Sequence, residues 1–220
     1  MCEIISSGNS SARIKRLDAL CSFFSRVEIE TMVLKFTNTL SGELEEFTPK
    51  NPLEVRMYVC GPTVYNYAHI GNARPAVIFD VLYRLLKEEY KSVLYARNYT
   101  DVDDKINAKA SADGVSIELL TNKYIDAYRA DTMALGVLAP DFEPRVTDNI
   151  VPIKQMIFQL VDQGFAYVVD GHVLFEVEKY RDYGNLAGRN VEDMIAGARI
   201  EVAPYKRNPA VFVLWKPSRD

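Results

Sequence analysis

The chain has few of the residues on which several classes of protein depend. Its 220 residues include three cysteines, two histidines and one tryptophan, and no apolar run is long enough to cross a bilayer. The cysteines lack paired spacing, which argues against a disulfide framework. The formal net charge of −4 gives no global attraction to nucleic acid, so any such contact needs a local basic patch.

The remaining composition is ordinary for a soluble globular protein. Apolar residues make up 48% of the chain and charged residues 25%. A chain of this length can bury the core of one domain, or of one domain with a small insertion. Neither an internal repeat nor a low-complexity segment is present, and these features alone do not indicate a function.

The most informative stretch is MYVCGPTVYNYAHIGN, residues 57–72. Alternation of apolar and other residues over 55–59 predicts a strand that ends at Cys60, and Gly61-Pro62 then breaks it. The sequence HIGN, residues 69–72, opens a predicted amphipathic helix. Its expected apolar face comprises Ile70, Val77, Ile78, Val81, Leu82 and Leu85. Pro75 lies early in this helix, where we expect its missing N–H to cost little.

A strand, a turn and a helix start form a corner that accepts phosphate. Unpaired amide N–H groups and the positive end of the helix dipole point toward whatever binds there. His69 and Asn72 can donate hydrogen bonds to charge that develops on a phosphate, and Gly71 lets a ring or a phosphate approach the backbone.

A second strand is predicted over 92–99, ending at Thr100. Strand, helix and strand then form a βαβ unit with parallel strands and a right-handed crossover. Ligands of such sheets bind beyond the carboxyl ends of the strands, so Cys60 and Thr100 are expected in one pocket. Thr100 is also a candidate N-cap for the next helix, with Asp103 and Asp104 in its first turn.

Three further elements are predicted. Helices are expected over 116–135, with Tyr124, Tyr128 and Leu135 on one side, and over about 149–163. A hairpin is expected around Asp170-Gly171, with 167–169 and 172–175 as its arms.

The HIGN corner resembles the His-Ile-Gly-His signature of class I aminoacyl-tRNA synthetases. Four further features resemble the cysteinyl-tRNA synthetase family in particular: Cys60 ahead of His69, RNYTDVDDKI over 97–106, LAGRN and AGAR over 186–199, and KRNPAVFVLWK over 206–216. This resemblance implies an α/β fold with a Rossmann-like parallel sheet that binds a nucleotide. It further implies that the fold is incomplete and carries the start of a connecting insertion.

The resemblance also implies a domain organisation. Residues 1–31 form an N-terminal extension that we expect to be disordered, residues 32–145 the ATP- and cysteine-binding half, and residues 146–220 the start of the insertion. Residues 33–47 are expected to form a first strand and hairpin. Residues 211–215 are expected to be a buried strand that returns to the nucleotide-binding sheet. Acidic residues near the N-terminus argue against a secretory signal or a mitochondrial presequence. Three cysteines without paired spacing, beside this fold, indicate a reducing cytoplasm.

By resemblance, the site residues have assigned roles. His69, Ile70, Gly71 and Asn72 would bind ATP with magnesium, His69 and Asn72 acting in catalysis. Cys60, Gly61 and Thr100 would bind the cysteine substrate. The cysteine carboxylate would attack the α-phosphate of ATP, and the cysteinyl group would then pass to tRNA(Cys). Asn72 replaces a second histidine of the family and cannot carry its positive charge.

Zinc is the metal that the resemblance implies, with Cys60 as a ligand. A soft metal selects a thiolate substrate over the hydroxyl of serine. Zinc needs three or four protein ligands, however, and neither Cys2, Cys21, His69 nor His172 is spaced as a metal pair with Cys60. We therefore expect the zinc site to be incomplete in this chain.

Structural alternatives remain open for each of these residues. Cys60 could be a small buried hydrophobe, His69 a helix cap, and Gly71 a turn glycine. Five basic residues near the end could contact tRNA or form a solvated surface: Arg189, Arg199, Lys206, Arg207 and Lys216. No Lys-Met-Ser-Lys-Ser loop is present, and Pro217 prevents the sequence WKPS from replacing it.

The overall prediction is the N-terminal part of a cysteine–tRNA ligase with little or no activity alone. Two alternatives are retained. One is a related ligase that joins activated cysteine to an amino sugar. The other is a non-catalytic nucleotide-binding or interaction module that pairs with a complementing polypeptide.

Overall fold

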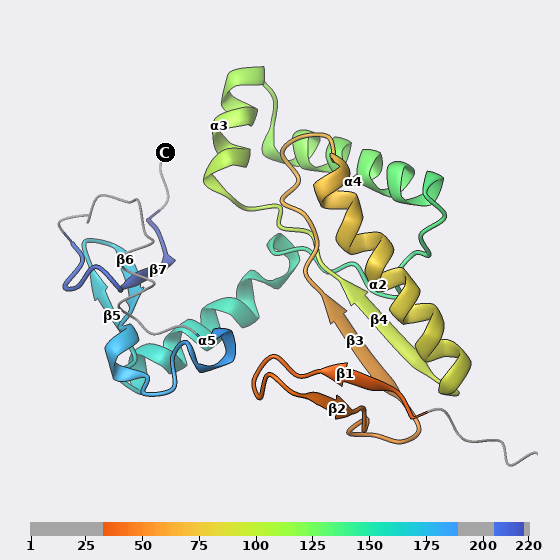
Figure 1. Cartoon of the computed structure of the whole chain (residues 1–220). Helices are drawn as coiled ribbons and strands as arrows, with labels where there is room; N and C mark the ends of the chain where they lie inside the picture. Colours follow the sequence, from red (N-terminus) through yellow and green to blue (C-terminus); the bar gives the residue numbers. More distant parts are fainter. Residues whose placement is uncertain (1–32, 189–204, 218–220) are drawn as a thin grey trace, which may run out of the picture. The chain divides into compact units, whose positions relative to one another are not determined.

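A computed structural model of the chain describes residues 33–188 and 205–217 (Figure 1). The predicted N-terminal extension, Cys2, Cys21, Arg189 and the AGAR segment lie outside the described residues. The chain divides into two compact units. The described part of the first is a hairpin in which β1 (Lys35–Thr37) pairs antiparallel with β2 (Leu44–Glu46), as predicted.

The second unit contains the predicted βαβ arrangement. Strand β3 (Val55–Val59) pairs in parallel with β4 (Val93–Arg97), Val55 lying opposite Val93 and Val59 opposite Arg97. Helix α2 (Ile70–Glu89) connects them and packs on the pair (Figure 1). The carboxyl ends of both strands therefore meet at one edge, which confirms the predicted α/β fold with a parallel sheet.

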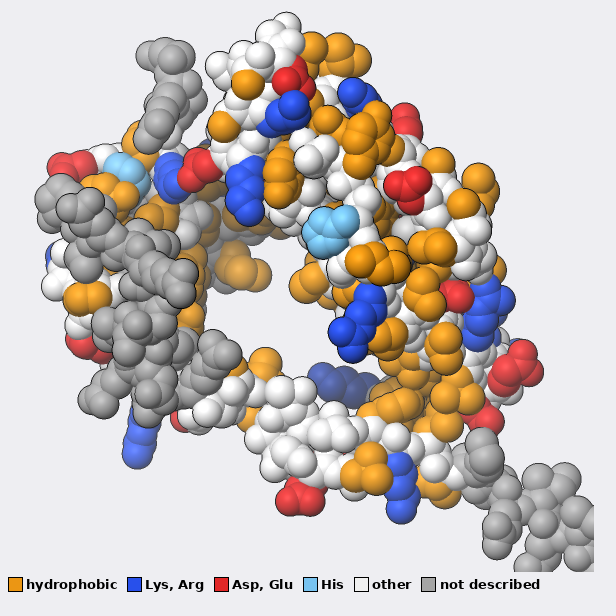
Figure 2. Space-filling view, turned by 45° about the horizontal axis from the view of Figure 1, so that its top comes forward, with side chains coloured by type: hydrophobic (Ala, Val, Ile, Leu, Met, Phe, Trp, Pro, Cys, Tyr) orange, Lys and Arg blue, Asp and Glu red, His pale blue; other side chains and the backbone are white. Residues whose placement is uncertain are grey.

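The predicted apolar face of α2 is wrong. Its buried residues are Ala76, Asp80, Tyr83 and Leu86, with Tyr83 packing against Val59 and Tyr95 of the sheet. Ile70, Val77, Ile78 and Val81 are exposed instead, and Figure 2 shows hydrophobic side chains gathered over α2. Apolar periodicity predicted the wrong face of this helix, and the face that packs on the sheet carries the large ring of Tyr83.

Two further helices form the core beside the site. Helix α3 (Asp104–Asp113) is followed by α4 (Ile117–Ala134), which Ser116 caps by accepting a hydrogen bond from the Leu119 amide. Buried side chains join these helices to the 62–69 loop: Val64, Tyr99, Ile106, Ala110, Leu120, Tyr124, Ile125 and Tyr128. Tyr124 and Tyr128 lie on the packed side as predicted, whereas Leu135, which follows the helix, is 54% exposed.

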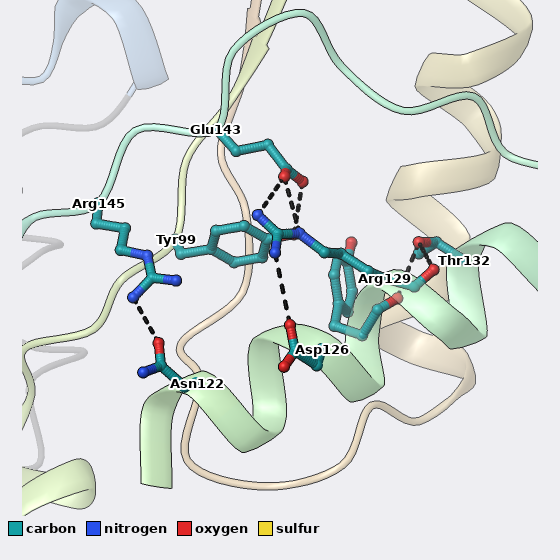
Figure 3. Close-up of polar contacts among 8 residues, drawn as sticks. Tyr99, Asn122, Asp126, Arg129, Thr132, Glu143 and Arg145 are labelled. Carbon is teal, nitrogen blue, oxygen red and sulfur yellow. Dashed lines mark hydrogen bonds and ion pairs between the residues drawn. The ribbon is translucent and has the colours of Figure 1, made fainter. Parts of the chain in front are cut away.

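A short segment after α4 adds a third line of backbone pairing along β4. The Arg97 amide donates to the Phe142 carbonyl at 2.9 Å, and the Tyr99 amide to the Pro144 carbonyl at 2.9 Å. Glu143 fixes this segment, because one carboxylate oxygen accepts from the Tyr99 hydroxyl at 2.7 Å and the other from two nitrogens of Arg129. Figure 3 shows the Arg129 guanidinium between Glu143 and Asp126. Nothing in the hydrophobic pattern of the sequence indicated this extra pairing.

The rest of the described chain forms a small α/β region. It contains η1 (Thr147–Asn149), α5 (Ile150–Asp162), β5 (Ala166–Val169), β6 (His172–Phe175), η2 (Val177–Lys179), η3 (Asn185–Ala187) and β7 (Phe212–Trp215). Helix α5 and the β5–β6 hairpin are as predicted. Asp170 and Gly171 have φ values of 46° and 73°, which match a type I′ turn.

Strand β7 corrects one prediction. It pairs antiparallel with β6 and does not join the β3–β4 pair. It is also only partly buried, whereas Val211 just before it is 2% exposed. An apolar run predicts that a strand will be covered, but it does not specify which edge that strand will join.

Among the described residues, every helix is too short or too polar to traverse a bilayer.

Four core tyrosines should make the stability of the fold fall at alkaline pH. Burial is the largest cause that raises the pKa of Tyr83, Tyr95, Tyr99 and Tyr128, and hydrogen bonding to Glu143 adds to it for Tyr99. Because these pKa values are raised in the folded state, their contribution to stability is complete below about pH 10 and falls as the pH rises further. We expect part of the tyrosinate absorbance to appear only together with loss of the circular-dichroism signal. If all 13 tyrosines ionised while that signal stayed intact, the packing described for these four would be wrong.

Candidate active site

His69 begins α2 and caps it. Its Nδ1 accepts a hydrogen bond from the Gly71 amide at 3.0 Å, while Oδ1 of Asn72 accepts from the His69 amide at 3.1 Å. These two bonds form a reciprocal capping box at the helix start. The structural alternative for His69 is therefore correct, and the question becomes what the cap leaves available for a ligand.

The cap fixes which atoms of His69 and Asn72 can meet a ligand. Since Nδ1 accepts, the single proton of a neutral imidazole lies on Nε2, which is left as a donor. Asn72 uses its oxygen in the cap, so its amide nitrogen keeps two donor hydrogens. Both side chains thus present N–H groups at a helix start, where the helix dipole also favours an anion.

Gly71 lets the His69 ring lie close to the backbone. A Cβ at this position would lie 2.7 Å from Cε1 and 2.9 Å from Nδ1 of His69. The chain here is helical, so the turn-glycine alternative does not apply. Ile70 is 83% exposed, so burial does not explain why an apolar residue stands at this position. Pro75 lies beyond the first turn, so it removes the helical hydrogen bond to the Gly71 carbonyl, contrary to the expectation that it costs little.

Gly61 lies where the ends of β3 and β4 approach most closely. Its amide donates to Oδ1 of Asn98 at 2.8 Å, and a Cβ on Gly61 would lie 1.7 Å from the Asn98 carbonyl oxygen. Cys60 precedes it as an exposed free thiol, so the alternative of a buried hydrophobe is wrong. A side chain at position 61 would push these strand ends apart, whereas the thiol at position 60 remains open to a ligand.

Thr100 is placed beside the turn that follows Gly61. Its amide donates to the Pro62 carbonyl and its carbonyl accepts from the Val64 amide, both at 3.1 Å. Thr100 does not cap α3, as had been considered; Asp103 does so by accepting from the Lys105 amide at 2.8 Å. Within residues 33–188 and 205–217 no partner is found for the Thr100 hydroxyl, so capping does not compete with a substrate for it.

Asp101 is a site-supporting residue that the sequence did not single out. It is 3% exposed and accepts hydrogen bonds from the Thr147 amide at 3.1 Å and from the Thr147 hydroxyl at 2.5 Å. These contacts tie the segment after β4 to the start of η1. Asp101 belongs to a run of carboxylates, and no local pattern predicts its distant partner.

A pocket of about 110 Å³ adjoins the helix start. It is lined by the 62–69 loop together with Asn72, Tyr124 and Tyr128. The pocket brings His69 and Asn72 together with Tyr65 and Tyr67. Of the seven predicted site residues, only His69 and Asn72 line this pocket. The other five do not: Cys60, Gly61, Ile70, Gly71 and Thr100.

The described residues do not fit the implied zinc site. In the described ranges no group of three or more histidine, cysteine, aspartate or glutamate side chains is arranged to hold a metal ion. Cys60 therefore has no set of co-ligands there, and no step of the chemistry below is assigned to zinc.

The parallel pair and the capped helix that connects its strands define an α/β fold with a parallel sheet. The structure of Mycobacterium tuberculosis methionyl-tRNA synthetase in complex with methionyl-adenylate has this fold, with a TM-score of 0.53 and 14% sequence identity. The match covers 73% of this chain and 44% of that one. The two chains therefore share a fold over the matched part.

Sequence comparison gives the family. The family described as "tRNA synthetases class I (C) catalytic domain" matches residues 46–220, and this chain belongs to it. The cysteine–tRNA ligase of Caulobacter sp. (strain K31) is 58% identical over 191 residues, which are 86% of this chain and 41% of the relative. The cysteine–tRNA ligase of Xanthomonas oryzae pv. oryzae (strain MAFF 311018) is 56% identical over 189 residues, 86% of this chain and 40% of the relative.

These comparisons confirm the resemblance to cysteinyl-tRNA synthetases. The chain spans about two fifths of the length of the curated relatives that it matches. Family membership thus applies to the catalytic-domain portion seen here, and what the longer relatives do is not transferred with it.

We expect an alanine substitution to change the free energy of unfolding by different amounts at the two glycines. Gly61→Ala places a methyl group against backbone and should lower the free energy of unfolding by about 3 kcal/mol. Gly71→Ala meets only a side chain that can swing away, and the lost cap of about 1 kcal/mol is offset by the higher helix propensity of alanine. Chemical denaturation of both variants measures the difference. Equal stabilities would contradict the close approach at Gly61.

Proposed function

We propose that this chain is the ATP- and cysteine-binding part of a cysteine–tRNA ligase. The observation that carries the proposal is the capped α2 start, where His69 and Asn72 present N–H donors beside an open pocket. Family membership supports the assignment, and the relatives' name supplies cysteine and tRNA as substrates. The cytoplasm as the site of action and tRNA(Cys) as the acceptor belong to the same proposal.

In the proposed reaction, a carboxylate oxygen of cysteine attacks the α-phosphorus of ATP. A bond forms between them, the bond from the α-phosphorus to the bridging oxygen breaks, and pyrophosphate leaves with that electron pair. The Nε2–H of His69, the amide of Asn72 and the α2 dipole would stabilise the phosphate charge, with magnesium supplied by ATP. The adenylate would then transfer its cysteinyl group to the terminal ribose of tRNA.

The cysteine substrate is proposed to lie at the carboxyl ends of β3 and β4. The exposed Cys60 thiol, the Gly61 backbone and the Thr100 hydroxyl all occur there. Thr100 is held by backbone hydrogen bonds to Pro62 and Val64, and the Gly61 amide is held by the Asn98 side chain, so both positions are fixed. Such fixed placement is what a reaction that depends on positioning requires.

A complementing polypeptide is included in the proposal. We expect the chain alone to catalyse little ATP–pyrophosphate exchange with cysteine, because it offers no zinc ligand set among its described residues and its sequence contains no Lys-Met-Ser-Lys-Ser loop. Exchange should appear when the part of the Caulobacter ligase that this chain does not match is added as a separate polypeptide. Exchange at the rate of an intact ligase by the chain alone would contradict the proposal that it needs a complement.

Histidine substitution tests the ATP contact. His69→Ala removes the Nε2–H donor and should weaken ATP binding about tenfold, as expected for one hydrogen bond to a charged group. The chain has one other histidine, and His172→Ala serves as its control because His172 stacks on Tyr205, away from α2. Isothermal titration of both variants with ATP gives the comparison. Equal losses in the two variants would remove His69 from the site.

A further inference from the structure

Each of the four tyrosines that line the pocket beside His69 has a lysine or arginine side chain over its ring. Nζ of Lys105 lies 5.5 Å from the ring centre of Tyr65, and Nζ of Lys123 lies 5.7 Å from Tyr67 and 5.3 Å from Tyr124. The guanidinium carbon of Arg97 lies 5.2 Å from the Tyr128 ring centre. Contacts of this kind attract a cation to the negative face of the ring. The wall of the pocket is therefore aromatic on the inside and positively charged around it.

Arg97 is the most unusual of these cations. It is 2% exposed, and its Nε and Nη1 are buried without a hydrogen-bond partner in the part of the chain that the structure describes. Because its guanidinium lies beside the Tyr128 ring, its charge opposes the rise in pKa that burial causes for Tyr95 and Tyr128. A buried charge without a carboxylate is costly, and a nearby anion would offset that cost.

The pocket supplies no negative charge of its own. Its lining residues include neither aspartate nor glutamate, and its polar groups are Thr63, Asn66, His69, Asn72 and the tyrosine hydroxyls. The tyrosine rings can stack on a flat ring, and the cations can meet a phosphate. A nucleoside phosphate combines both features in one molecule.

We propose that this cation-backed tyrosine pocket binds a nucleoside phosphate, with Lys105 and Lys123 as positioning residues for its phosphate and Arg97 as a fixed charge behind the wall. The inference rests on the proposed ATP-binding function and adds these three cations to it. Two sources share the chemistry, free ATP and the end of a single-stranded RNA.

Lysine substitution provides the test on the full chain. Lys123→Met and Lys105→Met keep the aliphatic stem and remove the charge, and both side chains are exposed, so folding should be unaffected. The matched control is Lys87→Met, since Lys87 makes the same contact, 5.2 Å from the ring centre of Tyr83, outside the pocket. Binding is measured by isothermal titration with ATP, with adenosine as the uncharged probe and with a short single-stranded RNA.

We expect Lys123→Met and Lys105→Met each to weaken binding of the phosphate-bearing probe by about fivefold, and their combination by about 25-fold. Adenosine binding should not change, Lys123→Arg should restore the affinity, and Lys87→Met should resemble the unmodified chain. A loss confined to ATP identifies the free nucleotide as the occupant, and a loss confined to RNA identifies the RNA end.

Other results overturn the inference. If the unmodified chain binds ATP and Lys123→Met weakens it no more than Lys87→Met, with RNA binding equally insensitive, the pocket is not the site although the proposed function stands. If ATP does not bind but RNA binds and depends on Lys123, the proposed ATP function fails and the inference stands. If neither probe binds, both are wrong.

Discussion

The close approach of Gly61 to Asn98 is the constraint on which the rest of the site depends. At 1.7 Å from the Asn98 carbonyl oxygen, the position of a Cβ is already occupied, so the strand ends can meet only through glycine. That contact lets residues 62–64 pair with Thr100 and directs the loop toward α2. His69 then reaches the helix start at an angle that allows its ring to fold back on the Gly71 amide. The order of these contacts follows the order of the sequence.

Two groups of tyrosine rings pack around this contact. On one side of the β3–β4 pair, Tyr83 and Tyr95 fill the space beneath α2. Beyond the strand ends, Tyr99, Tyr124 and Tyr128 form the floor beside α3 and α4. A large buried ring fills both places, and two of the hydroxyls donate to a carboxylate, that of Tyr83 to Asp141 and that of Tyr99 to Glu143. The packing around the site therefore consists largely of tyrosine rings that end in polar hydroxyl groups.

Local patterns in the sequence predicted the parts of this structure that local physics decides. The 55–59 strand, the helix from residue 70, the turn at Asp170-Gly171 and the strand–turn–helix corner all follow from alternation, capping and turn chemistry. The errors came from choices made over long distances. Which face of α2 packs, which strand β7 joins and which residue holds Thr147 depend on partners far away in the chain. The cap on α3 was misplaced for a smaller reason, since several carboxylates and a threonine compete within a few residues.

The exposed stripe of Ile70, Val77, Ile78 and Val81 lies on the same helix as the candidate site. It runs along the side of α2 opposite the buried face from which Tyr83 packs on the sheet. Water therefore covers large apolar side chains on one side of a helix whose other side is part of the core.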